Sequence, residues 1–191
     1  MLYIDIIAVC WFVFLVFWII SSVKVKRDIN RHGSLWVSVG ARLLIALAII
    51  SILRLPLVRH VMQEYIYKFT LAHPAIETVG TVLCVIGVAF AIWARANLGA
   101  NWSERPATKE EHELITSGPY RLVRHPIYFG MLLALLGTAL VSGVPGLLAL
   151  IGFGITLIHR IRVEERLMTQ LFPGKYPEYK RRTKCLIPYV V

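Results

Sequence analysis

The sequence predicts an all-α integral membrane protein with about five transmembrane helices, the last two joined as a helical hairpin. Of its 191 residues, 57% are hydrophobic and the mean hydropathy is +0.65, whereas soluble domains contain roughly 45–50% apolar residues. The hydrophobic residues are gathered in long runs, and the net charge of +10 comes from basic residues that flank those runs. Such charges fix topology and attract anionic headgroups, and this placement argues against nucleic-acid binding.

The first three apolar runs each suit a membrane-spanning helix. Residues 2–22 are almost continuously apolar, which is long enough to cross a hydrocarbon core of about 30 Å. The second run, 36–57, contains arginines that we expect to extend toward opposite interfaces. The third run covers 74–93. Its Gly80 and Gly87 lie on one helix face and would allow close contact with another helix.

Two shorter apolar runs, 126–141 and 144–158, follow a polar stretch. Each is short for an isolated span, and the glycines and proline at 142–146 predict a turn, so we expect a helical hairpin whose ends extend into water. Charged residues from His159 onward would continue the second helix beyond the membrane. The tail at 175–184 is basic and aromatic, and we expect it to face phospholipid.

Counting spans places the polar half of the chain on the cytoplasmic side. The loop 23–35 is basic, so the positive-inside rule makes it cytoplasmic and puts the N-terminus outside. With an odd number of spans, the C-terminus and the polar stretch 95–125 also lie inside. We therefore expect one membrane domain over 1–191, with three spans in 1–94 and the polar loop, hairpin and tail in 95–191.

The positions of the cysteines predict no disulfide bond. Cys10, Cys84 and Cys185 lie far apart without a C-x-x-C pair, so they are expected to act as small apolar residues, with neither a disulfide nor a metal site.

The hairpin would bring residues 120–128 beside residues 159–166 at the cytoplasmic lip of the membrane. Polar side chains where the backbone enters lipid usually have a function. A lip between lipid and cytosol suits a water-soluble cofactor together with a lipid-like substrate. Carboxylates and aromatic faces favour a sulfonium or ammonium group, and arginine favours a carboxylate or phosphate. The residues expected to converge are Tyr120, Arg124, His125, Tyr128, His159, Arg160, Glu164 and Glu165.

Three motifs in this order resemble the isoprenylcysteine carboxyl methyltransferase family and the related phospholipid methyltransferases. They are HELITSGPYRLVRHPIYFG at 112–130, RIRVEERL at 160–167 and YPEYKRR at 176–182. The resemblance, which covers residues 90–185, implies an integral membrane enzyme that uses S-adenosyl-L-methionine, bound in a cytoplasmic pocket. It implies a lipophilic acceptor, with the carboxylate of a prenylcysteine-like substrate favoured, membrane lipids as further partners, and neither nucleic acid nor a metal.

The resemblance also implies roles for individual residues. Arg160 would be the catalytic residue that orients the acceptor carboxylate, Glu164 would hold the polar end of the cofactor, and Tyr120 would pack on it. The expected cofactor-binding residues are His112, Glu113, Leu114, Ile115, Tyr120, His125, Pro126, Ile127, Tyr128 and Glu164.

Several of these residues also have purely structural interpretations. His125 and Pro126 could simply begin a helix, Tyr120 and Tyr128 could belong to an interfacial aromatic belt, and the acids after His159 could form surface ion pairs.

Two acceptor classes differ in the chemistry they need. An ionised carboxylate attacks a sulfonium in line without a general base, so alignment and desolvation would supply catalysis. The amine of an ethanolamine lipid must lose a proton, and His125 or Glu165 would then be the base. A small thiol or another lipophilic acid is a third acceptor class. Outside the methyltransferases, two alternatives remain: a nicotinamide-dependent reductase of the sterol type, and a non-enzymatic membrane scaffold.

Overall fold

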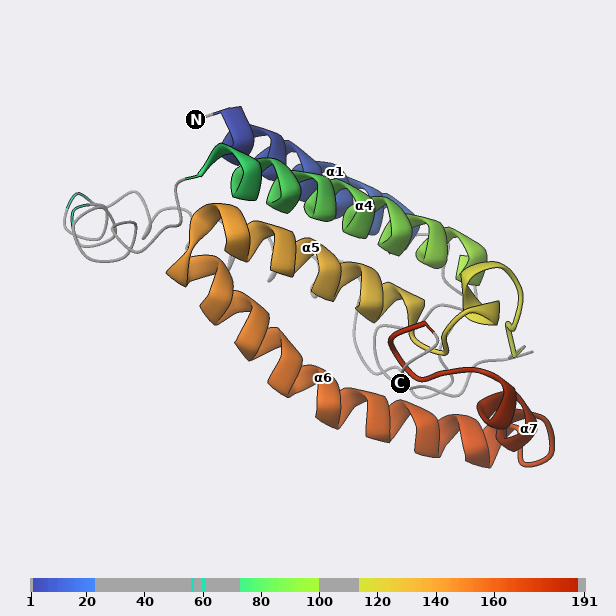
Figure 1. The fold of residues 1–191 in the computed structure, drawn as a ribbon. Coiled ribbons are helices and arrows are strands. Elements are labelled where there is room, and N and C mark those ends of the chain that lie inside the picture. Colours follow the sequence, from blue (N-terminus) through green and yellow to red (C-terminus); the bar gives the residue numbers. More distant parts are fainter. Residues whose placement is uncertain (1, 23–55, 57–59, 61–72, 100–113, 189–191) are drawn as a thin grey trace.

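A computed structural model of the chain describes residues 2–22, 56, 60, 73–99 and 114–188. This part of the protein is helical (Figure 1), and the predicted second span falls almost entirely outside it. The elements are α1 (Leu2–Ser22), α4 (Pro74–Leu98), the 3-10 turn η4 (Gly118–Arg121), α5 (Pro126–Ser142), α6 (Val144–Leu171) and α7 (Lys175–Arg182).

The helices confirm an integral membrane protein. Within the described ranges, α1, α4 and α6 are long and apolar enough to cross a bilayer, and α5 is a shorter apolar helix. Helix α4 extends beyond its predicted end, to Leu98. Helix α6 continues past its apolar run to Leu171, as expected for the charged residues from His159 onward. The charged residues that close an apolar run do not interrupt helical hydrogen bonding, so a helix continues until a residue such as Gly99, at φ 52°, leaves the helical conformation.

The predicted hairpin is confirmed at Gly143. This residue ends α5 and begins α6 with φ 68°, and its N–H donates to the carbonyl of Ala139. Because a positive φ costs glycine little, the chain reverses here in a single residue, and α5 and α6 run antiparallel (Figure 1).

Helices α4 and α5 pack with their backbones almost in contact. A Cβ atom added at Gly87 would lie 2.4 Å from the nitrogen of Ala134 and 2.6 Å from the carbonyl oxygen of Gly130. At Gly137 it would lie 2.2 Å from the carbonyl oxygen of Gly80. Only glycine permits this approach, which confirms the close helix contact predicted for Gly80 and Gly87.

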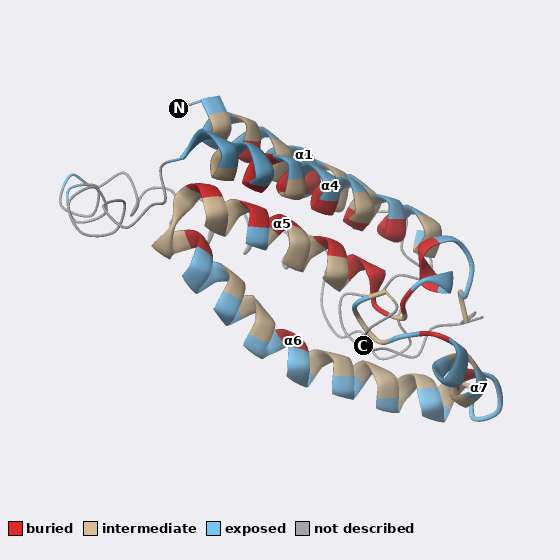
Figure 2. Ribbon diagram, viewed as in Figure 1, coloured by how far each residue is buried: buried red, intermediate tan, exposed pale blue. Residues whose placement is uncertain are grey.

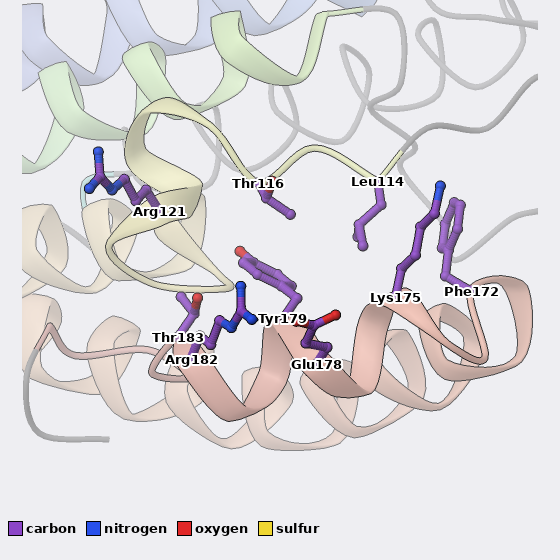
Figure 3. A pocket seen from close by; sticks show the side chains of 9 residues that line it. All are labelled: Leu114, Thr116, Arg121, Phe172, Lys175, Glu178, Tyr179, Arg182 and Thr183. Carbon is purple, nitrogen blue, oxygen red and sulfur yellow. Dashed lines mark ion pairs between the residues drawn. The ribbon is translucent and has the colours of Figure 1, made fainter.

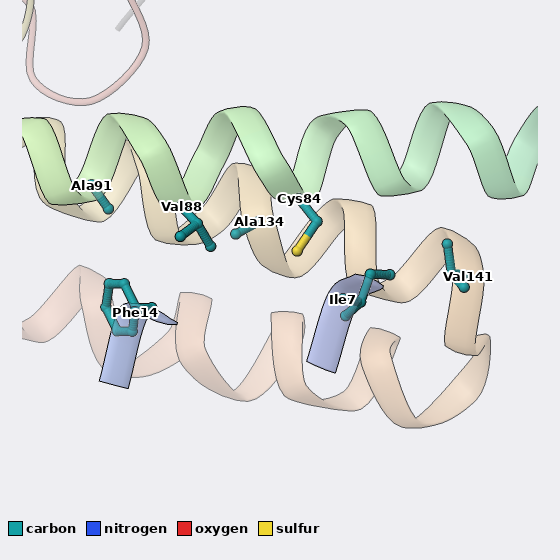
Figure 4. Close-up of a cluster of buried hydrophobic side chains, with 7 residues drawn as sticks. All are labelled: Ile7, Phe14, Cys84, Val88, Ala91, Ala134 and Val141. Atoms are coloured by element: carbon teal, nitrogen blue, oxygen red, sulfur yellow. The ribbon is translucent and has the colours of Figure 1, made fainter. Parts of the chain in front are cut away.

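Helix α1 completes the core by packing on α4 and α5 (Figure 4). The side chain of Trp11 donates from Nε1 to Thr138 Oγ1 at 3.0 Å, which links α1 to α5. Buried residues concentrate where α4 and α5 face each other, whereas α1 and α6 present exposed apolar side chains outward (Figure 2), as lipid-facing helices do. The buried cluster consists of Ile7, Phe14, Cys84, Val88, Ala91, Ala134 and Val141.

The C-terminal ends of α1 and α4 are joined by a buried arginine. Arg95 is 2% exposed, and it donates to the carbonyl of Ser21 at 2.8 Å and to that of Gly99 at 2.9 Å. Its guanidinium also lies 6.0 Å from the ring centre of Trp18. The three helices α1, α4 and α5 therefore form a fixed block, at one end of which the polar segment before α5 lies.

Candidate active site

The segment before α5 is anchored by Tyr120. The turn η4 begins at Gly118, whose φ of 59° and contact with the Asn97 side chain leave no room for a larger residue. It places Tyr120, 7% exposed, against Ala94 and Ile127. Burial raises the pKa of the Tyr120 phenol above its usual range. This tyrosine is therefore a neutral, fixed part of the platform from which α5 begins.

The start of α5 and the C-terminal part of α6 meet around Glu164. The hydroxyl of Tyr128 donates to Glu164 Oε1, and Arg160 Nε donates to the same oxygen at 2.9 Å. The guanidinium of Arg160 lies 5.7 Å from the ring centre of Tyr128. An aromatic ring, a cation and a carboxylate are thus held together at the place predicted from the hairpin.

The imidazole of His125 lies between two neighbouring acids of α6. Its Nδ1 is 3.7 Å from Glu164 Oε2 and its Nε2 is 3.6 Å from Glu165 Oε1. The ring stacks on Tyr128 at 5.5 Å. The side chain is only 8% exposed, and Nε2 has no hydrogen-bond partner among the residues that the structure describes. These spacings are longer than hydrogen bonds, so the acids act on the ring electrostatically.

Glu165 belongs to a second polar cluster. Its Oε1 accepts from Arg124 Nε at 2.8 Å and its Oε2 from Lys180 Nζ at 2.5 Å, although the carboxylate is only 12% exposed. Arg124 also donates to the carbonyl of Lys180 at 3.2 Å and to that of Thr183. Glu165 therefore connects α6 to the segment before α5 and to the C-terminal tail.

One group of potential metal ligands lies in this cluster. Ligand atoms of His125, Glu165 and Cys185 lie within 4.8 Å of one another. However, the Glu165 carboxylate is already paired with Arg124 and Lys180, and burial followed by the charge of Glu165 raises the pKa of the Cys185 thiol. Since a metal needs a deprotonated thiol and no competing cations, these three residues do not suit a cation.

The tail that follows α7 lies along the segment that precedes α5. Val123 and Lys184 form a parallel backbone bridge. The N–H of Arg124 donates to the carbonyl of Lys184 at 2.8 Å, and the N–H of His125 donates to that of Cys185 at 3.1 Å. The backbone that carries His125 is therefore fixed by the last part of the chain.

Helix α7 adds a side-chain contact to the same segment. Tyr179 donates from its hydroxyl to the carbonyl of Tyr120 at 2.6 Å, and Tyr176 is only 3% exposed. Burial raises the pKa of the Tyr179 phenol above its usual range, so the hydroxyl keeps its proton and remains a donor. The basic run of the tail was expected to face phospholipid. The two tyrosines are directed into the protein, whereas Lys180 stays half exposed while it pairs with Glu165.

A pocket of about 950 Å³ opens beside these contacts (Figure 3). Its size falls in the range of roughly 300–1,000 Å³ that is usual for ligand sites. The walls combine aromatic rings with three cations and one acid. In Figure 3, Leu114 and Thr116 project toward α7, and Lys175 and Tyr179 project from α7 toward them. The lining residues are Leu114, Thr116, Arg121, Phe172, Lys175, Glu178, Tyr179, Arg182 and Thr183.

Residues 76–175 match the family described as "Phospholipid methyltransferase". This stretch is more than half of the chain and contains α5, α6, the segment before α5 and all of α4 except its first two residues. The chain belongs to the phospholipid methyltransferase family. It is a membrane methyltransferase, which decides against the reductase and the scaffold alternatives, and its family implies a methyl donor.

Individual relatives resemble this chain over different shares of its length. The probable protein-S-isoprenylcysteine O-methyltransferase of Oryza sativa subsp. indica is 27% identical over 175 residues, which is 83% of this chain and 91% of the relative. The protein-S-isoprenylcysteine O-methyltransferase of Saccharomyces cerevisiae is 32% identical over 131 residues, 65% of this chain and 54% of the relative. The cobalt-zinc-cadmium resistance protein CzcN of Cupriavidus metallidurans is 35% identical over 82 residues, 42% and 38% of the two chains.

A solved structure shares the fold of this chain. The eukaryotic intramembrane Ras methyltransferase ICMT (isoprenylcysteine carboxyl methyltransferase) superposes with a TM-score of 0.54 and 24% sequence identity. The match covers 61% of this chain and 46% of that one. Over the matched part, this chain therefore has the fold of a known membrane methyltransferase.

The structure brings some of the predicted residues of this methyltransferase together and separates others. His125, Tyr128, Arg160 and Glu164 form one cluster. Ile115, Tyr120 and Ile127 pack in the adjoining apolar cluster, Pro126 begins α5, and Leu114 lines the pocket. His112 and Glu113 lie outside the described residues, and His159 is exposed on α6.

The sequence reasoning missed the second polar cluster. It placed Arg124 and Glu165 near the site, with Glu165 only as an alternative base, and it gave Tyr179 and Lys180 no contact. A weak signal was available, because Glu165 follows Glu164 directly and must point about 100° away from it around the helix. One of the two acids therefore needed a partner outside the Arg160 cluster.

Proposed function

We propose that this protein transfers the methyl group of S-adenosyl-L-methionine to the carboxylate of a lipophilic, prenylcysteine-like acceptor. The observation that carries the proposal is the Tyr128–Arg160–Glu164 cluster, held where an apolar hairpin meets a polar tail. Relatives that align with most of this chain are named protein-S-isoprenylcysteine O-methyltransferases, which supports a carboxylate acceptor.

The residues present fit such a cofactor. S-Adenosylmethionine supplies a methyl group on a sulfonium, and it also carries an ammonium group. Glu164 is a half-buried carboxylate, and the His125 and Tyr128 rings stack beside it. Carboxylates and aromatic faces are the groups that bind such cations. His125 Nε2, buried and without a described hydrogen-bond partner, leaves one further polar atom for the ligand.

Arg160 suits the acceptor side. Its side chain is 41% exposed while its Nε holds Glu164. A guanidinium matches the planar geometry of a carboxylate, so Arg160 would orient the acceptor carboxylate at the exposed edge of the cluster. Because a carboxylate is already ionised at neutral pH, the protein needs to align it and exclude water, and no residue has to accept a proton.

We further propose the topology on which this assignment depends. The protein would be a single membrane domain with five spans, with its N-terminus outside and its C-terminus in the cytoplasm. The site would then open to the cytosol, where the cofactor is soluble. Support comes from the basic residues that follow α6 and from the positive-inside rule.

A second acceptor, the amine of an ethanolamine phospholipid, is favoured by one observation. The His125 imidazole lies between two carboxylates, which is a suitable arrangement for a group that accepts a proton from an amine. The family description, phospholipid methyltransferase, agrees with that acceptor.

The stability of the methylated product in mild base distinguishes the two acceptors. The purified protein is incubated with methyl-labelled cofactor and either S-farnesylcysteine or phosphatidylethanolamine in lipid nanodiscs. A carboxyl methyl ester releases labelled methanol in mild base, whereas an N-methyl group does not. Base-labile label on farnesylcysteine supports the proposal, and base-stable label on the phospholipid supports the second acceptor. Label on neither, with cofactor binding intact, contradicts both.

A further inference from the structure

The C-terminal tail makes hydrogen bonds to the segment 120–125, which contains residues of the candidate site. Tyr179 binds the carbonyl of Tyr120 at 2.6 Å, and backbone hydrogen bonds link Arg124 and His125 to Lys184 and Cys185. Two of the residues expected to bind the cofactor, Tyr120 and His125, therefore have their backbones fixed by the tail. The family match ends at residue 175, where α7 begins, so most of the tail lies beyond it.

Glu165, which lies on α6, joins the tail to the segment before α5 through ion pairs. Its two oxygens pair with Arg124, from the segment before α5, and with Lys180, from α7. Arg124 in turn binds two carbonyls of the tail. Three segments far apart in the sequence thus share one carboxylate, and that carboxylate also lies 3.6 Å from His125 Nε2.

We propose that residues 175–185 form a strap that is part of the cofactor site, and that Glu165 and Lys180 are positioning residues that hold it closed. Through Arg124 and the paired backbone they set the positions of His125 and Tyr120, and hence the affinity for S-adenosylmethionine. This inference rests on the proposed function. Closing of the strap and binding of the cofactor are then linked. A closed strap raises the affinity for the cofactor, and bound cofactor stabilises the closed strap by the same free energy.

The ion pair of Lys180 is a contact of the strap that one substitution can remove selectively. The Lys180 side chain is 50% exposed and Glu165 is 12% exposed, so Lys180→Met removes one ion pair without opening a buried cavity. Arg124 still neutralises Glu165 in that variant. Arg166, which follows Glu165 on α6, is exposed and lies outside the strap, so it gives a matched control of equal charge.

The test measures binding of S-adenosylhomocysteine to the detergent-purified full chain by calorimetry. We expect Lys180→Met and Glu165→Gln to raise the Kd by about five- to tenfold, which is the range of a moderate coupling between sites. Lys180→Arg should restore near-normal affinity, and Arg166→Met should leave it unchanged. Circular dichroism and the Tm check that the variants remain folded. If Glu165→Gln does not fold, the comparison of Lys180→Met with Lys180→Arg and Arg166→Met is sufficient.

Hydrogen exchange supplies a measurement that a merely structural role would not change. S-Adenosylhomocysteine should slow exchange of the amides of Arg124 and His125 in the wild-type protein, and this protection should shrink in Lys180→Met. Wild-type affinity and wild-type protection in both folded variants would overturn the strap while leaving the proposed function intact. Absence of any binding to the folded wild-type protein would overturn the proposed function, and the strap inference with it.

Discussion

The hydroxyl of Tyr128, on the first turn of α5, donates a hydrogen bond to the carboxylate of Glu164 near the end of α6. Thirty-six residues separate the two side chains in the sequence, and the hairpin between them brings them together. The contact fixes Glu164 at the mouth of the hairpin, where Arg160 also reaches it.

Replacing Tyr128 with phenylalanine tests whether this contact orients the carboxylate. A hydrogen bond to a charged group contributes about 1.5–3 kcal/mol, and Arg160 still holds Glu164 in the variant, so we expect a loss at the lower end of that range. The Kd for S-adenosylhomocysteine should rise by about tenfold, as measured by calorimetry. Tyr3→Phe, which removes a hydroxyl that bonds Thr78 at the far end of α1, is the control. Equal affinity in Tyr128→Phe and the wild type would exclude this role.

Replacing Arg160 with alanine separates acceptor binding from cofactor binding. If the guanidinium orients an acceptor carboxylate, kcat/KM for the acceptor should fall by about a hundredfold, the scale of one lost charge-assisted contact. The Kd for S-adenosylhomocysteine should rise by no more than the roughly tenfold expected for Tyr128→Phe, because Tyr128 still holds Glu164 in this variant. Arg162→Ala, an exposed position two residues along α6, is the matched control. Loss of cofactor affinity in parallel with kcat/KM would place Arg160 on the cofactor side instead.

Much of this arrangement follows from the sequence because it depends on local signals. The glycines at 142–146 predict the reversal, and the hairpin then requires residues near 125 and 164 to meet. Docking of the tail has no such signal: Arg124 and Thr183 are 59 residues apart, and no periodicity or turn relates them. The expectation that the basic run of the tail faces phospholipid stays a prediction. Lys180, Arg181 and Arg182 are all exposed, but the ion pair of Lys180 with Glu165 was not predicted. The five-span count stays a prediction, since it depends on residues outside those described.

The rate at which the Cys185 thiol is alkylated should show whether the tail is packed against Glu165. Burial and the nearby charge of Glu165 raise the pKa of this thiol above its ordinary value, and only the thiolate reacts with iodoacetamide. Alkylation should therefore rise with pH at a higher midpoint than that of an unhindered cysteine, near pH 8.5. The protonated thiol contributes stability below its ordinary pKa, and that contribution disappears as the pH rises through the raised value.

Mass spectrometry of alkylated peptides follows Cys185 separately from Cys10 and Cys84. Glu165→Gln removes a charge that raises the pKa, so its midpoint should move to lower pH. A midpoint at the ordinary cysteine value in the wild-type protein would show that the thiol is neither buried nor close to Glu165 in solution.

The backbone contact between α4 and α5 predicts a large and position-specific effect of one methyl group. In Gly87→Ala the added Cβ would lie 2.4 Å from the nitrogen of Ala134, so the two helices must separate. Overpacking of this kind costs about 1–3 kcal/mol. Gly152→Ala in α6 meets nothing within 4 Å, and it replaces glycine with a better helix former, so its Tm should be unchanged or higher. Thermal unfolding in detergent compares the two variants. A lower Tm for Gly87→Ala alone confirms that α4 and α5 pack backbone to backbone, because both variants add the same atom to a transmembrane helix and differ only in what that atom meets.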